Sequence, residues 1–488
     1  MEGIERTKQI LVVKVCYCTD IKNFNIYILY NKMKYYIKIA PLFLLLSAFS
    51  CQIDDAPKAH EPGSNEYTNQ WMYEQMKKYY YWNEGIGEQG DLALMPKNYF
   101  KSLLNPSDRF SYAYNSTMAE TLSKSIRSKF GFDISFVNHE EKVYGVILYV
   151  LKDSPAQRSK LHRGQLIAAI GGVVIDQNNY ENLYKSFAIA DNVQLQLTEY
   201  SENIGFFNSL AVTLSDGFTF LQPVNHKIIT QQNHMVGYVE IPHFDVGLTQ
   251  SLLNVFHDFK NKSVTDVIVD LRYNGGGDVS SAAALSILLA PNIQATDQFI
   301  LFKGNKNGGK IKQTFKEALE MNEAQVSYDA LRAAHPLIQR VYILCGNRTA
   351  SASEIMINNL NPFMQVVTIG DQTLGKDVAG FAIEDEREAE PSEWVLYPAI
   401  YKIYNSNKEG DYFGGLTPVI QSDELKKLEV YPLGDTREVL LKQALNSILG
   451  GKLNTENNAS NAILSLPIKN AYLESEPVVI KRSQSVYN

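Results

Sequence analysis

Residues 270–278 read Asp-Leu-Arg-Tyr-Asn-Gly-Gly-Gly-Asp, and they stand directly between a predicted strand and a predicted helix. The apolar run 267–271 is typical of a buried strand, and the alanine-rich run 280–289 is typical of a helix. Three successive glycines let a backbone approach a ligand closely and direct its amides outward at a helix N-terminus, where the macrodipole favours negative charge. The stretch suits an oxyanion hole. It is not a phosphate loop, because no Gly-Lys-Ser/Thr follows it.

The sequence on both sides of this stretch alternates strands with helices. The predicted elements are strands at 236–241, 267–271, 341–344 and 366–369, a helix at 249–259, and a helix that begins near Ser353. This βαβ rhythm predicts an α/β domain over residues 225–450.

A second segment that could carry catalytic chemistry spans residues 345–355, where small residues occupy a strand-to-helix turn. Small neighbours leave a hydroxyl open to a substrate and leave the adjacent backbone N–H free to donate. We expect Ser353 to cap the helix that follows. Downstream, Lys376 stands in a loop between turn residues. A buried lysine with a lowered pKa can act as general base for a serine.

Together these segments resemble the C-terminal processing, or tail-specific, proteases, which use a Ser–Lys dyad. The family has a Ser-Ala-Ser-Ala-Ser-Glu run whose middle serine is the nucleophile, and this chain has Thr-Ala-Ser-Ala-Ser-Glu at 349–354. The resemblance therefore implies that Ser351 is the nucleophile. The family lysine stands 25 residues later in a Gly-Lys pair, as Lys376 does here.

The resemblance also implies a crotonase-like protease core and an oxyanion hole made by the backbone amides of Gly275, Gly276 and Ala352. One departure concerns the base. Many family members carry Gln or Glu four residues after the lysine, where it orients that base, whereas this chain has Gly380. Either a dyad suffices or another group, such as Glu354, substitutes; the third role stays unassigned.

Residues 126–215 are predicted to form a separate β-rich domain. Alternating apolar positions predict strands at 130–136, 143–151 and 166–170, followed by a helix at 180–188. The motif within 154–167 resembles the PDZ domains attached to bacterial proteases, which bind a peptide C-terminus by adding it as a strand. The resemblance places the carboxylate at Phe130, Gly131 and Phe132. The alternative is a small β-rich domain that binds nothing.

The two ends of the chain are read as follows. Residues 1–32 are expected to precede the true start, 33–50 form a lipoprotein signal peptide, and Cys51 follows a run that resembles a bacterial lipobox. The remaining predicted segments are a tether at 51–66, an N-terminal helical domain at 67–125 and a C-terminal tail at 451–488 without assigned function. An ordinary cleaved signal peptide, with Cys51 incidental, is the alternative.

Composition limits the remaining function classes. The chain has 488 residues with 46 basic and 53 acidic side chains, and its net charge of −7 argues against nucleic acid as a partner. No His/Cys/Asp/Glu cluster has metal-ligand spacing, so we expect neither a metal nor a cofactor. A Ser-His-Asp mechanism would need a histidine such as His243, close to Asp245, but no residue pattern ties it to Ser351.

The sequence thus predicts a multidomain α+β protein: a lipid-anchored serine endopeptidase of the Gram-negative cell envelope, held at the outer membrane. Its expected partners are protein or peptide substrates with free C-termini and, through the anchor, the membrane. A catalytically silent peptide-binding lipoprotein is the first alternative, and the absence of a side chain at Gly380 favours it. A small-ligand binder on the same scaffold is the second.

Overall fold

The computed structural model describes residues 60–118, 121, 124–217, 222–322, 325–387, 393–450, 463–467 and 487. All elements below belong to the unit formed by residues 61–488. The signal peptide, Cys51 and most of the tether lie outside the described residues.

The secondary structure follows the expected order. The helices are α2 (Asn65–Tyr79), η1 (Asn83–Gly85), α3 (Pro96–Ser102), α4 (Ile126–Phe130), α5 (Pro155–Arg158), α6 (Tyr180–Ile189), α7 (Thr249–Asn261), α8 (Val279–Leu289), α9 (Phe315–Leu319), η3 (Glu320–Asn322), α10 (Tyr328–Ala334), α11 (Ala352–Leu360) and α12 (Val439–Ile448). The strands are β1 (Tyr112–Asn115), β2 (Phe132–His139), β3 (Lys142–Val150), β4 (Leu166–Ile170), β5 (Val173–Val174), β6 (Asn192–Ser201), β7 (Gly205–Ser215), β8 (Asn225–Gln231), β9 (His234–Glu240), β10 (Asp266–Asp270), β11 (Gln298–Gly304), β12 (Lys310–Thr314), β13 (Arg340–Cys345), β14 (Gln365–Gly370), β15 (Val378–Ala379), β16 (Ile383–Glu384), β17 (Trp394–Tyr397), β18 (Tyr401–Tyr404), β19 (Ile420–Gln421) and β20 (Leu464–Leu466).

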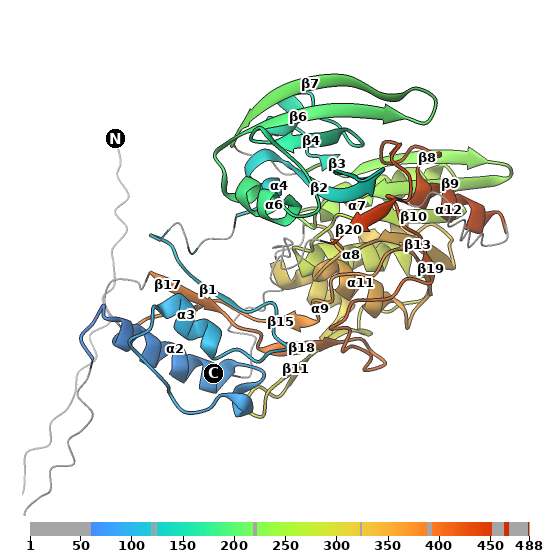
Figure 1. Cartoon of the computed structure of the whole chain (residues 1–488). Coiled ribbons are helices and arrows are strands. Elements are labelled where there is room, and N and C mark those ends of the chain that lie inside the picture. Colours follow the sequence, from blue (N-terminus) through green and yellow to red (C-terminus); the bar gives the residue numbers. More distant parts are fainter. Residues whose placement is uncertain are drawn as a thin grey trace, which may run out of the picture. The chain divides into compact units, whose positions relative to one another are not determined.

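The central sheet has the strand order β19-β14-β13-β10-β9-β8, and it is parallel except for the β8–β9 hairpin (Figure 1). The predicted βαβ units are present, since α7 joins β9 to β10 and α11 joins β13 to β14. Crossovers of this kind bring the carboxyl ends of the parallel strands to one edge. The glycine turn (residues 274–278) and the turn before α11 both follow that edge.

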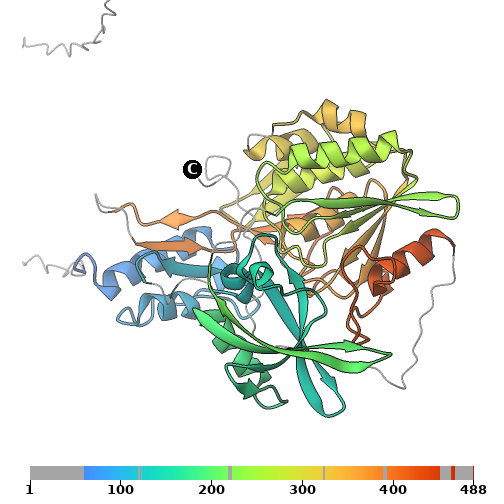
Figure 2. The ribbon, with the colours of Figure 1, turned by 90° about the horizontal axis from the view of Figure 1, so that it is seen from above.

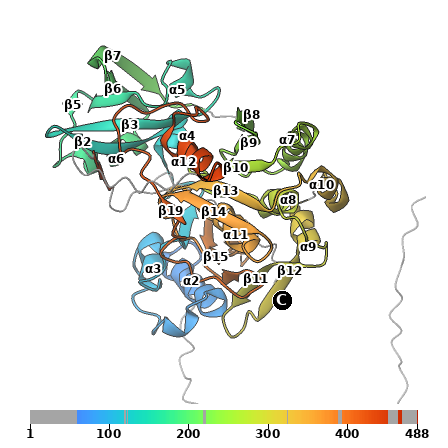
Figure 3. The ribbon, with the colours of Figure 1, turned by 90° about the vertical axis from the view of Figure 1, so that its right-hand side faces the viewer.

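Helices cover both faces of this sheet (Figures 2 and 3). Along β10, Val267 and Val269 pack with α7, α8 and α11, whereas Ile268 points to the opposite face and packs with α12. Both faces of a parallel strand are therefore buried, which explains the continuous apolar run in the sequence.

Residues 126–215 form a second sheet with its own apolar core, in the order β2-β3-β4-β6-β7. The predicted strand at 130 is wrong by two residues, because 126–130 form helix α4 and Gly131 ends it in the left-handed conformation with φ 77°. Strand β20, from the C-terminal tail, pairs antiparallel with the free side of β2. No pattern in the sequence indicates this pairing.

The N-terminal region is not purely helical. In α2, Trp71 and Tyr79 are buried in the core, whereas Tyr67 and Tyr73 are half-buried. Strand β1 pairs with β17, more than 270 positions along the chain, so residues 67–125 share a sheet with the protease-like region. The mixed α/β, multidomain character of the prediction is confirmed.

Gly237 on β9 gives a test of the packing between sheet and helix. A Cβ added there would lie 2.8 Å from the ring of Phe259 on α7, closer than side chains tolerate. We predict that Gly237→Ala lowers the free energy of unfolding by about 1–3 kcal/mol through overpacking. Urea denaturation measures it. The control is Gly87→Ala at an exposed glycine with open space around it, which should stay within about 0.5 kcal/mol of the unmodified chain.

Candidate functional site

Ser351 lies in the turn between β13 and α11 and immediately precedes the first helical residue, Ala352. Its φ of 58° and ψ of −119° are rare for a residue with a side chain, and it is fully buried. Strained residues of this kind persist only where surrounding contacts hold them, and they concentrate at functional sites. The expected cap is wrong: Ser351 occupies the cap position, while the Ser353 hydroxyl donates to the Asn274 carbonyl at 3.1 Å.

Lys376 lies in the loop between β14 and β15 and is only 4% exposed. Its Nζ is 5.6 Å from the centre of the Phe110 ring, which comes from the segment before β1. Arg109 beside it donates to the carbonyls of Leu374 and Phe413, both at 2.8 Å. The N-terminal region therefore helps to fix the lysine loop.

The carboxylate of Glu354 joins the serine turn to the lysine loop. Its Oε2 accepts hydrogen bonds from the backbone N–H of Ser351 at 3.0 Å and of Lys376 at 2.8 Å. Its Oε1 accepts from the Thr373 hydroxyl at 2.5 Å and the Gly375 N–H at 2.6 Å. Two bonds to one oxygen keep the backbone nitrogens of Ser351 and Lys376 within about 6 Å of each other. The structure thus brings the two predicted residues together.

The glycine turn packs directly on this site. Gly276 has φ 111°, and a Cβ there would meet the Cβ of Ser351 at 2.7 Å, so only glycine fits. The Gly276 N–H, however, donates to Oδ1 of Asn274 at 2.9 Å. Among the described residues no partner is found for the N–H groups of Gly275 and Ala352. Of the three amides predicted to form an oxyanion hole, those of Gly275 and Ala352 thus remain available as donors, whereas that of Gly276 does not.

The packing around Gly380 explains why this chain lacks the Gln or Glu that many family members carry at this position. A Cβ at this position would lie 2.4 Å from the carbonyl oxygen of Pro398, so a Gln or Glu side chain has no room there. Glu354 fixes the backbone of Lys376 instead.

Two further groups lie near the site. His243 Nδ1 is 2.9 Å from Asp245 Oδ1, and its Cε1 lies 2.8 Å from where a Cβ of Gly277 would be. The structure therefore places this pair beside the glycine turn, which the sequence pattern did not show. Tyr412, which no sequence pattern singled out, has a buried hydroxyl with no partner among the described residues. Burial and the negative charges of Glu354 and Asp377 raise its pKa.

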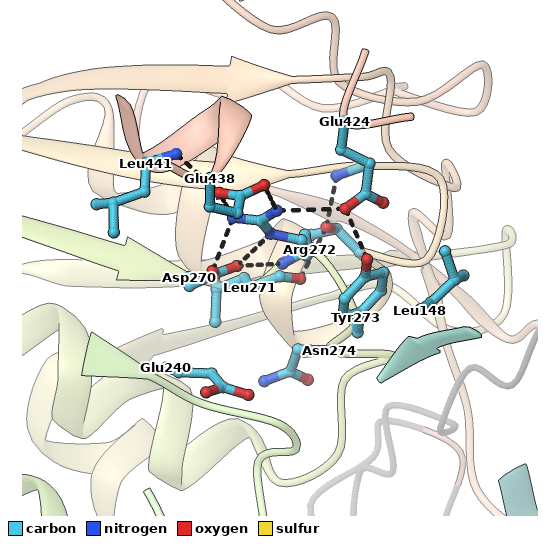
Figure 4. Close-up of polar contacts among 12 residues, drawn as sticks. Leu148, Glu240, Asp270, Leu271, Arg272, Tyr273, Asn274, Glu424, Glu438 and Leu441 are labelled. Carbon is cyan, nitrogen blue, oxygen red and sulfur yellow. Dashed lines mark hydrogen bonds and ion pairs between the residues drawn. The ribbon is translucent and has the colours of Figure 1, made fainter. Parts of the chain in front are cut away.

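Behind the glycine turn, Arg272 is buried between carboxylates (Figure 4). Its Nε and Nη2 bond the two oxygens of Asp270, each at 3.0 Å, and Nη1 and Nη2 bond Glu438 at 2.6 and 2.9 Å. Burial by itself would raise the pKa of Glu438, but the adjacent charge of Arg272 outweighs it and lowers that pKa to about 2. The ionised cluster fixes the end of β10, from which the glycine turn starts.

Glu424 extends this cluster toward the second sheet. Its Oε2 accepts from Arg272, from the Tyr273 hydroxyl at 2.6 Å and from Arg163 at 3.0 Å. Arg163 belongs to the loop before β4 and also bonds the Tyr273 hydroxyl and the carbonyl of Leu148. One ionic cluster thus connects residues 126–215 with the glycine turn.

The three residues expected to hold a peptide carboxylate are placed differently from the prediction. Phe130 and Phe132 are buried in the core of the second sheet. The Gly131 N–H donates to the Arg127 carbonyl at 2.9 Å, as the C-cap of α4. In this structure that amide does not face an incoming carboxylate.

Within the described ranges, His, Cys, Asp and Glu form no group that could hold a metal ion. In the same part of the chain, no helix combines the length and apolar character needed to cross a bilayer.

Two sequence profiles match the chain: Peptidase family S41 over residues 235–422, and Peptidase S41 N-terminal domain over residues 67–112. The chain therefore carries domains of peptidase family S41. The family resemblance drawn from the motifs is confirmed, and with it the class of serine-type peptidases. The first profile spans the glycine turn, the serine turn and the lysine loop.

Relatives of this chain include carboxyl-terminal-processing peptidase 3 of Arabidopsis thaliana, 24% identical over 49% of this chain and 44% of the relative. The carboxyl-terminal-processing protease of Picosynechococcus is 25% identical over 60% of this chain and 62% of the relative. The chain therefore spans less than two thirds of these relatives. A crystal structure from Bacteroides fragilis, assigned to the S41 proteases, has a TM-score of 0.62 and 26% identity over 78% of this chain and 97% of its own.

Glu354 gives the first test of the site. An amide nitrogen cannot accept a hydrogen bond, so Glu354→Gln leaves donors of the serine turn or the lysine loop unpaired. We predict a loss of about 1–3 kcal/mol in the free energy of unfolding and a fall in kcat of about 10²-fold, since Ser351 and Lys376 are misplaced. Glu320→Gln, at an exposed glutamate, is the control. Unchanged kcat in a folded Glu354→Gln protein would contradict the role.

The pKa of Glu354 predicts a pH dependence of stability. Burial raises this pKa from 4.5 to about 7, although its hydrogen bonds favour the ionised form. The folded chain then holds a proton that the unfolded chain releases, so this group's contribution is full below pH 4.5 and is lost as the pH rises through 7. Between these values the free energy of unfolding should fall by about 1.4 kcal/mol per pH unit for this group, and Glu354→Gln should remove that share. The free energy of unfolding is measured by urea denaturation at several pH values. An equal change with pH in both proteins would contradict the prediction.

The chain offers a matched pair of Asp-x-Arg motifs for testing the ionic cluster. Arg272 bonds Asp270 where both are buried, and Arg437 bonds Asp435 with the arginine side chain 66% exposed. We predict that Arg272→Met costs about 3–5 kcal/mol, because buried carboxylates lose their counter-charge. Arg437→Met should cost about 0–1 kcal/mol. Similar losses in thermal or urea unfolding would show that the buried cluster does not fix the turn.

Proposed function

We propose that this protein is a processing endopeptidase in which Ser351 is the nucleophile and Lys376 the general base. The observation that carries the proposal is the carboxylate of Glu354, which bonds the backbone N–H of both residues. The match of residues 235–422 to peptidase family S41, the strained backbone of Ser351 and the burial of Lys376 support it.

The chemistry is acyl transfer. The neutral amine of Lys376 takes the proton of the Ser351 hydroxyl as its oxygen attacks the scissile carbonyl. The N–H groups of Ala352 and Gly275 stabilise the oxyanion of the tetrahedral intermediate. The Lys376 ammonium then returns the proton to the leaving amine, and an acyl-enzyme remains. In deacylation, Lys376 takes a proton from water as the water oxygen attacks the ester. When the intermediate collapses, the ammonium returns that proton to the Ser351 oxygen and the new C-terminus is released.

The substrates we propose are proteins presented to residues 126–215 as extended segments, with the PDZ-like mode of strand addition at β2. Relatives named for carboxyl-terminal processing support this class. We further propose that a lipid on Cys51 holds the enzyme at the outer membrane of a Gram-negative envelope; the support is the lipobox-like sequence alone. No nucleic acid is among the proposed partners.

A catalytically silent peptide-binding protein is the second candidate. The observation in its favour is the lack of space for a lysine-orienting side chain at Gly380. Turnover of an unstructured protein such as casein by the chain from Cys51 onward separates the two candidates.

The dyad predicts the outcome of three substitutions. Ser351→Ala and Lys376→Ala should each lose nearly all turnover of casein, and the double variant should be little worse than either, because both residues serve one step. Ser353→Ala, two positions from the nucleophile, should retain most activity. Full turnover by Ser351→Ala would exclude the assignment. If His243→Ala abolished turnover and Lys376→Ala did not, the base would be the His243–Asp245 pair.

A further inference from the structure

The C-terminal tail supplies a strand to the sheet proposed to receive substrates. Leu464–Leu466 pairs antiparallel with β2, in the register Phe136 with Leu466, Val137 with Ser465 and Asn138 with Leu464. The other side of β2 is paired with β3. The tail therefore occupies the edge at which an added peptide strand would pair.

Side chains on α6 hold the tail in place as they would hold a bound peptide. Leu466 packs against the apolar core of the second sheet, together with Tyr180 and Leu183 of α6. The Tyr180 hydroxyl donates to the carbonyl of Pro467 at 3.0 Å, and its ring contacts Phe136 edge-on at 5.3 Å. The tail segment thus lies between β2 and α6, with an aliphatic side chain directed into the core.

The direction of the tail agrees with that of a ligand whose C-terminal end points to the 130–132 turn. Moving from Leu464 to Leu466 along the tail moves back along β2 from Asn138 to Phe136. Pro467 follows, and proline has no N–H with which to continue a ladder. The self-bound segment therefore stops short of the turn.

We propose that residues 463–467 are an intramolecular ligand of the β2 edge, which competes with substrate and which displays the edge's preference for an extended aliphatic segment, Ile-Leu-Ser-Leu-Pro. The inference rests on the proposed function, which makes the β2 edge the substrate-binding site. It goes beyond that function by naming the segment that occupies the edge and the class of side chain that the edge accepts.

The test is a binding measurement on chains that also carry Ser351→Ala, so that no peptide is cleaved. The probe is a fluorescein-labelled synthetic peptide with the sequence of residues 460–469. Leu466→Asp introduces a charge where the tail meets the core, whereas Ser465→Asp introduces the same charge at an exposed neighbour. We expect the Leu466→Asp chain to bind the peptide at least tenfold more tightly than the unmodified tail and the Ser465→Asp control.

Equal affinity in all three chains would overturn the inference, and so would absence of binding to the Leu466→Asp chain, which would make β20 a structural strand only. Leu466→Ala serves as a milder variant, and hydrogen exchange at residues 134–139 reports directly on the edge. Exchange there should speed up in the Leu466 variants and slow again when peptide is added; unchanged exchange would also overturn the inference.

The proposed function is tested separately, with native Ser351 in place. Casein turnover by either tail variant supports the peptidase whatever the peptide affinities, and its absence from all of them counts against the peptidase alone. If both hold, Leu466→Asp should lower KM for casein severalfold and leave kcat nearly unchanged. An unchanged KM would contradict competition by the tail.

Discussion

The site depends on one buried carboxylate. Glu354 accepts hydrogen bonds from the Ser351 and Lys376 N–H groups through a single oxygen, and from Thr373 and Gly375 through the other. Neither the serine turn nor the lysine loop is a regular element, so without this acceptor their relative position would rest on the strands alone. Because burial disfavours its charge, the arrangement holds only while every donor is in place. The geometry of the site therefore depends on Glu354 as much as on Ser351.

A second buried cluster fixes the other half of the site. Arg272 is held by Asp270 and Glu438, so the strand end, the glycine turn and the start of α12 are joined in one ionic contact. Glu424 carries that contact on to Arg163 in the second sheet. Arg348, three positions before Ser351, bonds Asp133 and the carbonyl of Ile134 on β2. The second sheet and the turns that carry Ser351 and Gly276 are therefore linked by two separate sets of charged side chains.

The sequence predicted well what depends on local pattern. The βαβ elements, the strand-to-helix position of Ser351 and the glycine turn all follow from runs of apolar and small residues. It predicted poorly what depends on the partner of a backbone amide: Gly131 caps a helix, and Gly276 donates to Asn274. Such hydrogen bonds join residues at irregular sequence separations, so no periodic pattern in the sequence reveals them. Sequence pattern could name Glu354 only as one candidate for the third role, because its bonds to Thr373, Gly375 and Lys376 join separate segments. The position of His243 beside Gly277 was hidden for the same reason.

The position of the C-terminal tail strand is another feature that sequence pattern alone does not predict. Ile463–Pro467 is a short aliphatic run in a polar segment, and by pattern alone it could be a strand anywhere or nowhere. What determines its place is that β2 would otherwise expose unpaired N–H and C=O groups beside an apolar core, and such an edge accepts any extended chain of suitable side chains. Under the proposed function, an edge that receives many different substrates cannot be selective enough to exclude the protein's own tail. Covalent attachment then gives the tail a high effective concentration, so weak intrinsic affinity is enough to close the edge while still allowing a better segment to displace it.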